Sequence, residues 1–212
     1  MVKILLAYEE VNPDKPHSWS KTPVWQAAIF EDEKTAKLLL ECQEVNPDMP
    51  DNNGMTMFSC AVLVGFERVV KILLGREDVN PDKPDNWGRT ALSHAASMGR
   101  EEIVKILLGR EEVNPDKPDD MGQTPLSYAA ERGYEGVLKI LLGRQEVNPD
   151  KPDNFGQMTL SYAAEYGHEG VVKLLLGREE VNPHTPDCTG TTPLMYAVRG
   201  DYKKVIALLQ PP

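Results

Sequence analysis

Few side chains in this sequence have the types and spacing that catalysis or metal binding requires. The chain contains four histidines with no partner at a catalytic or metal-binding spacing, namely His17, His94, His168 and His184. The stretch HEGVV at His168 lacks the second histidine that a zinc-binding helix needs. No glycine-rich phosphate loop follows a strand pattern. The sequence therefore favours a non-catalytic protein without a metal or cofactor.

Cysteine usage and net charge narrow the location and the partners. The three cysteines are odd in number and far apart, which is typical of a reducing compartment, so we expect a cytoplasmic location. The net charge of -10 and the pI of about 4.9 argue against nucleic acid and against an anionic membrane surface. The apolar start of the chain is short and Glu9 and Glu10 follow it, so it is no signal peptide.

Internal repeats organise the whole chain. The triplet Val-Asn-Pro begins at Val11 and recurs every 34 residues as far as Val181, with no insertion or deletion. We therefore predict a single repeat domain, residues 1–212. Its expected parts are a partial repeat at 1–16, full repeats at 17–50, 51–84, 85–118, 119–152 and 153–186, and a shorter last repeat at 187–212.

The first half of each repeat predicts a turn followed by a short helix. In repeat 85–118, the segment Asp85–Gly88 fits a type I turn, with Asp at its first position and Gly at its fourth. Thr90 can then cap a helix, and sister repeats place Pro directly after this Thr, at the first helical position. The small pair Ala95-Ala96 lets neighbouring helices approach closely, and Gly99 ends the helix.

The second half predicts another helix and a return loop. The segment REEIVKILLG, residues 100–109, has a broad apolar face that includes Leu107, and it closes at Gly109. Glu101 and Lys105 form an expected i,i+4 pair on the solvent side, as do Glu135–Lys139 and Glu169–Lys173. The Asn-Pro and Lys-Pro pairs that follow predict an extended loop.

These residues resemble the ankyrin repeat over essentially the whole chain. The segments DNWGRTALSHAASMGREEIVKILL and TPLSYAAERGYEGVLKILL carry its turn, Thr-Pro-Leu and Leu-Leu motifs. The period is 34 rather than the family's 33, and Met158-Thr159 reverses the order of Thr and its neighbour. The resemblance implies an all-α solenoid of stacked helix-turn-helix repeats with finger loops. It also implies non-catalytic recognition, most often of another protein.

The resemblance further implies which residues face that partner, on a concave surface made by turn tips and first helices. These are the third and fifth turn positions and the end of the first helix, where variation between repeats concentrates. Large apolar residues at several of them suit an interface; alternatively, each packs over the proline loop of the next repeat. The candidates are Trp19, Lys21, Phe30, Trp87, Arg89, Met98, Met121, Gln123, Arg132, Phe155, Gln157 and Tyr166.

Two further expectations concern the context of the chain. We expect a monomer that binds another protein. The alternative is a regulatory or sensing arm of a larger multidomain protein, similar to the near-identical ankyrin arrays of fungal receptor-like NTPases, in which docking is intramolecular. Because residues 1–16 repeat the interior pattern without a polar cap, we also expect more repeats before Met1 and early fraying of this segment.

Overall fold

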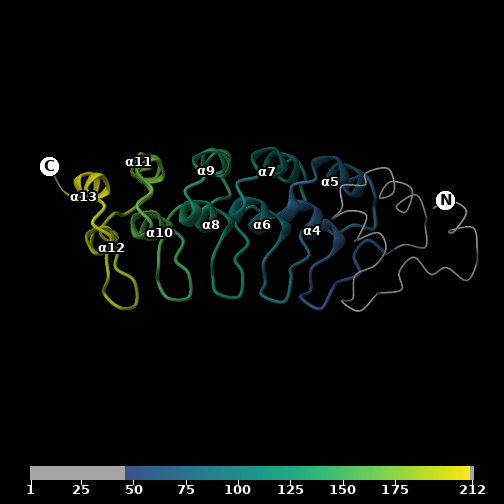
Figure 1. Ribbon diagram of the computed structural model, residues 1–212, viewed down its shortest axis with the longest axis horizontal. Coiled ribbons are helices and arrows are strands. Elements are labelled where there is room, and N and C mark those ends of the chain that lie inside the picture. Colours follow the sequence, from purple (N-terminus) through teal and green to yellow (C-terminus); the bar gives the residue numbers. More distant parts are fainter. Residues whose placement is uncertain (1–45, 211–212) are drawn as a thin grey trace, which may run out of the picture. The chain divides into compact units, whose positions relative to one another are not determined.

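The computed structural model of the chain describes residues 46–210, and within them it contains helices and turns but no strand (Figure 1). The chain divides into two compact units, Met1–Ala91 and Leu92–Pro212. The first unit contains α4 (Met57–Val64) and α5 (Glu67–Leu74) in its described part. The second, which α6 enters across the boundary, contains α6 (Ala91–Ser97), α7 (Glu101–Leu108), α8 (Pro125–Arg132), α9 (Glu135–Leu142), α10 (Thr159–Glu165), α11 (Glu169–Leu176), α12 (Pro193–Arg199) and α13 (Lys203–Leu209).

The helices of the second unit form two rows, which confirms the predicted all-α repeat architecture (Figure 1). In one row, α10 packs against both α8 and α12. In the other row, α9 lies between α7 and α11, and α11 also packs against α13. Leu107, Leu141 and Leu175 of the second row are fully buried, as are Ala129 and Ala163 of the first. Each repeat therefore completes the core of its neighbours.

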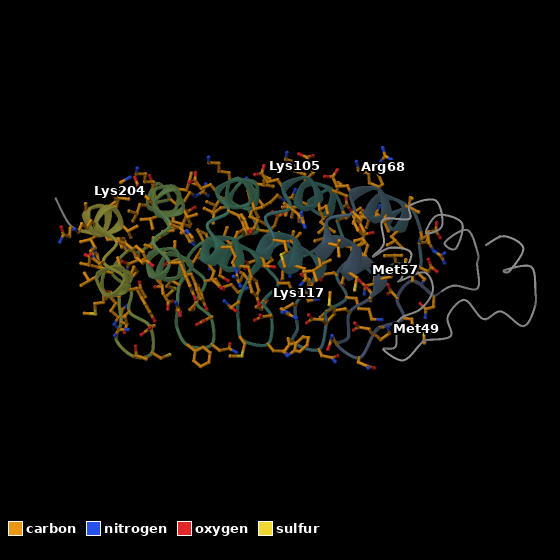
Figure 2. The ribbon with its side chains drawn as sticks, in the orientation of Figure 1. Met49, Met57, Arg68, Lys105, Lys117 and Lys204 are labelled. Carbon is orange, nitrogen blue, oxygen red and sulfur yellow. The ribbon has the colours of Figure 1, made fainter. Side chains whose placement is uncertain are left out.

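Two local expectations are corrected by the structure. Glu135–Lys139 and Glu169–Lys173 pair as expected, but Lys105 pairs with Glu102 instead of Glu101. The position of Glu102 is Arg68 in the preceding repeat and Gly136 and Gly170 in the two that follow, so repeat 85–118 alone among these has a second carboxylate beside its lysine. Figure 2 shows Lys105 and Lys204 on the row of second helices, on the side away from the loops.

The Asn-Pro and Lys-Pro pairs predicted extended return loops, but the loops are not extended throughout. The side chain of Asn114 accepts a hydrogen bond from the Asp116 N–H at 3.0 Å, and Asn148 accepts one from Asp150 at the same distance. These Asx turns fold the centre of each loop back on itself. In addition, the Lys151 ammonium donates to the backbone carbonyl of Asp116 at 2.9 Å, which ties each of these two loops to the other.

Within residues 46–210, a Thr cap begins both first helices in which Thr precedes Pro. Thr124 accepts a hydrogen bond from the Ser127 N–H at 3.3 Å, and the Ser127 hydroxyl accepts one from the Thr124 N–H at 2.8 Å. This capping box satisfies backbone donors that the helix leaves open. Thr192 accepts in the same way from the Met195 N–H. Thr therefore defines the first residue of the helix that follows.

Repeat 153–186 lacks this cap because Met158 stands at the cap position and Thr159 follows it. Met158 occupies the N-cap position with the same extended backbone as Thr124, but its side chain makes no capping bond. The hydroxyls of Thr159 and Ser161 are buried without a hydrogen-bond partner. A buried polar group in this state is destabilising, so the exchange weakens the start of α10.

Restoring the usual order should stabilise the protein. We expect the double variant Met158→Thr with Thr159→Pro to raise the free energy of unfolding by about 1–2 kcal/mol, from a new cap and a fixed N1 residue. Urea denaturation of the two proteins measures this difference. The reciprocal variant, Thr124→Met with Pro125→Thr, is the matched control and should lose a similar amount. Equal stability of all three proteins would contradict the role assigned to the cap.

Candidate functional site

One aspartate holds each turn of the second unit in shape; Asp119 and Asp153 are buried and Asp187 is half-buried. In Asp153, Oδ1 accepts hydrogen bonds from the backbone N–H groups of Phe155 and Gln157, both at 2.8 Å. Its Oδ2 accepts a hydrogen bond from the Tyr162 hydroxyl at 2.7 Å. The same three bonds are made by Asp119, to Met121, Gln123 and Tyr128, and by Asp187, to Thr189, Thr191 and Tyr196. The carboxylate thus fixes the backbone at the third and fifth turn positions.

Backbone hydrogen bonds keep adjacent turns in register. The Asn154 N–H donates to the Met121 carbonyl at 3.0 Å, and the Asn154 amide side chain donates to the Asp120 carbonyl at 2.8 Å. One repeat later, the Cys188 N–H donates to the Phe155 carbonyl at 2.8 Å. The third turn positions of successive repeats therefore lie side by side and present their side chains as a row.

Two side chains of that row, Met121 and Phe155, are large, apolar and about half exposed, whereas the third, Thr189, is polar. Met121 has 49% of its surface exposed and Phe155 has 56%. Tyr166, at the end of the first helix in the same repeat as Phe155, has 48% exposed and stacks on the His168 ring, with 6.4 Å between ring centroids. Met98, at the end of α6, is 46% exposed. A row of half-exposed apolar side chains on a rigid support is a feature of binding surfaces.

The polar candidates surround these apolar side chains. Gln157 donates from Nε2 to a carboxylate oxygen of Glu165 at 2.8 Å, which links the turn to the end of α10. The Gln123 side chain acts on the Tyr162 hydroxyl of the next repeat and lowers its pKa, against the larger effect of burial. Arg132 is exposed and lies 3.5 Å from the Glu131 carboxylate. We call this surface the turn face of the second unit, and its candidate residues are Met98, Met121, Gln123, Arg132, Phe155, Gln157 and Tyr166.

The first unit carries the same kind of turn with a different charge arrangement. Arg89 donates from Nε to Asp85 Oδ2 at 2.9 Å, and the guanidinium lies 4.7 Å from the centroid of the Trp87 ring. Half of the Trp87 surface is exposed. Here an arginine neutralises the turn aspartate, whereas the turns of the second unit use a tyrosine hydroxyl. Candidates Trp19, Lys21 and Phe30, and the partial repeat 1–16, lie outside the described residues.

Three groups beneath the turns of the second unit have shifted pKa values, namely Tyr162, Tyr196 and Asp187. Burial raises the pKa of Tyr162, and its hydrogen bond to Asp153 raises it further. Burial and the Asp187 bond act in the same way on the pKa of Tyr196. Desolvation alone would raise the pKa of Asp187, but hydrogen bonds from the hydroxyls of Tyr196 and Thr189 lower it to about 2. At neutral pH the Tyr196–Asp187 pair is therefore a neutral phenol and a charged carboxylate.

The phenol–carboxylate bond is the part of the site that sequence reasoning missed. Its signal is a Tyr nine residues after the turn Asp, at Tyr128, Tyr162 and Tyr196. The same position holds Cys60 and His94 in the two preceding repeats. Three of the five described repeats therefore have Tyr nine residues after the turn Asp. The pattern was easy to overlook because the other two have Cys and His there.

Other kinds of site are not seen in the part of the chain that the structure describes. No group of three or more His, Cys, Asp or Glu side chains within residues 46–210 is arranged to hold a metal ion. None of the helices in that range combines the length and the apolar character needed to cross a bilayer.

A comparison with protein families agrees with the repeat architecture. A family model described as ankyrin repeats (3 copies) matches the chain over residues 1–85, 65–153 and 138–211. A comparison with curated proteins gave no significant match.

Proposed function

Because the chain belongs to the ankyrin repeat family, whose repeats are generally protein–protein interaction modules, we propose that it binds another protein through the turn face of its second unit. Ankyrin repeat domains are typically non-catalytic, and the chemistry of this surface agrees with recognition rather than reaction. The residues of the turn face present exposed apolar side chains and the amide groups of two glutamines on a backbone that hydrogen bonds hold in place.

The row of Met121, Phe155 and Tyr166 is the observation that carries this proposal. Each of the three exposes about half of its surface, and hydrogen bonds to the turn aspartates hold the backbone of Met121 and Phe155. Aromatic and Met side chains are enriched at protein interfaces, and fixed supports lower the entropy lost on binding. Arg132 and the two glutamines supply the polar groups that set specificity at the edge of such a patch.

Removing one aromatic ring tests the proposal. We expect Phe155→Ala to weaken partner binding by about 30-fold, as for a binding hot spot, while the melting temperature changes little because the ring is already 56% exposed. Binding is measured by pull-down from a suitable lysate, followed by titration of the captured protein. Trp87→Ala tests the corresponding position in the first unit.

Met195→Ala provides a matched control for this experiment. Met195 is 51% exposed but lies on α12, outside the turn face. The Met195→Ala variant should bind the captured protein as tightly as the unaltered chain does. If Phe155→Ala instead lowers the melting temperature and leaves binding intact, the ring serves packing, and the turn face is not the binding surface.

A further inference from the structure

The turn face of the second unit combines its apolar row with an excess of negative charge. Six carboxylates and two guanidinium groups belong to the turns of the second unit, residues 119–123, 153–157 and 187–191, and to the ends of the first helices that follow them. The carboxylates are Asp119, Asp120, Glu131, Asp153, Glu165 and Asp187, and the guanidinium groups are Arg132 and Arg199. No lysine occurs in these segments. The face is therefore acidic as well as apolar.

The turn aspartates contribute charge without being neutralised by a cation. Asp119, Asp153 and Asp187 accept only from backbone N–H groups and from neutral hydroxyls, as described above. The first unit differs, because Arg89 pairs with Asp85 at 2.8 Å. Partial burial of these carboxylates reduces their screening by solvent, so their field extends to the surface above them.

Glu131 and Glu165 bring further charge beside the apolar row. The side chain of Glu131 is only 17% exposed, and it pairs at 3.5 Å with Arg132, which is itself largely exposed. Glu165 is half-buried and accepts a hydrogen bond from neutral Gln157. Burial raises the pKa of the Tyr166 hydroxyl, and the charges of Glu131 and Glu165 raise it further, which places both carboxylates within electrostatic reach of this ring.

From this arrangement we infer that the turn face of the second unit binds a segment of another protein that carries both apolar and cationic side chains. The inference rests on the proposed function and adds the chemistry of the partner. Apolar side chains of the segment cover Met121, Phe155 and Tyr166, while its Lys or Arg side chains lie near Glu131 and Glu165. Complementary charge of this kind sets specificity and accelerates association.

Three synthetic peptides of equal length and identical apolar pattern test the inference. Their polar positions are all Lys and Arg, all Glu and Asp, or all Gln. At low salt we expect the whole chain to bind the basic peptide at least about tenfold more tightly than the Gln peptide, with the advantage reduced at high salt. Binding of the acidic peptide should be weakest. Fluorescence anisotropy of labelled peptides measures all three affinities.

Charge variants locate the effect on the face. The variant Glu131→Gln with Glu165→Gln keeps a hydrogen-bond acceptor for Gln157 but should remove most of the basic peptide's advantage. The control variant Glu111→Gln with Glu179→Gln removes the same charge from exposed positions elsewhere and should bind as the unaltered chain does. Circular dichroism confirms that both variants remain folded.

The outcomes separate this inference from the proposed function. Equal losses in both charge variants, or acidic binding as tight as basic binding, would overturn the inference. If the acidic peptide binds and Phe155→Ala abolishes that binding, the turn face is a binding surface with a different charge preference. If the basic peptide binds with full sensitivity to Glu131 and Glu165 but none to Phe155, the charge inference stands and the apolar part of the proposed function fails.

Discussion

The variant Leu107→Ala should lose about 2–5 kcal/mol of the free energy of unfolding. Leu107 lies on α7, which packs against α9, and its side chain is fully buried. Its truncation removes apolar contacts on both sides of a repeat interface and leaves a cavity, because the rigid stack cannot close around it. Urea denaturation monitored by circular dichroism measures the change.

Ile106 is the matched control for this measurement. It is the adjacent residue on the same helix, of the same size, but only half-buried. The Ile106→Ala variant should lose clearly less than Leu107→Ala. A loss below about half a kcal/mol for Leu107→Ala would mean that this residue does not face the core.

The second large effect is expected at the buried turn aspartate. Asp153→Ala removes the acceptor of three hydrogen bonds, from the N–H groups of Phe155 and Gln157 and from the Tyr162 hydroxyl. Hydrogen bonds to charged groups contribute more than neutral ones, and buried donors without an acceptor are costly. We therefore expect a loss of about 3 kcal/mol. Thermal and urea unfolding should both report it.

Two companion variants show whether the loss comes from these bonds. Asp153→Asn keeps a side-chain oxygen for the turn N–H groups and should lose less than Asp153→Ala. Asp120→Ala removes an equal charge from an exposed neighbouring turn position and should change stability little. If Asp120→Ala is as destabilising as Asp153→Ala, then loss of charge rather than loss of hydrogen bonds explains both.

The fold could be predicted from the sequence because its signals are local and repeated. The turn Asp and Gly, the Thr before the first helix and the apolar helix face fall at the same places in repeats 51–84, 85–118 and 119–152, so the pattern of one repeat supports the reading of the next. Gly88 has the positive φ of 78° that its turn position requires. The repeat interface also followed from sequence, since Ala129 and Ala163 are buried where small residues were expected.

The hydrogen bonds of the site were less predictable because they depend on side-chain direction across a repeat. Nothing local in the sequence showed that Tyr162 reaches back to Asp153, or that Gln157 bonds Glu165. The i,i+4 rule named Glu101 as the partner of Lys105, but a second carboxylate at Glu102 competed successfully. Likewise, the exchange of Met158 and Thr159 was visible in the sequence. That the hydroxyls of Thr159 and Ser161 lack a hydrogen-bond partner depends on how they pack, which the sequence does not show.

The bonds between neighbouring repeats have an evolutionary consequence. Asn154 bonds the residue 34 positions before it, Asp120, and Lys151 bonds Asp116, 35 positions before it. Because each bond joins adjacent repeats through positions that recur with the same period, loss or duplication of one whole repeat regenerates the same set of bonds at the new junction. Recombination between near-identical gene segments can therefore reorder Met121-type and Phe155-type turns without disturbing the scaffold. Such a gene could acquire a new binding specificity in one genetic event, before any point mutation.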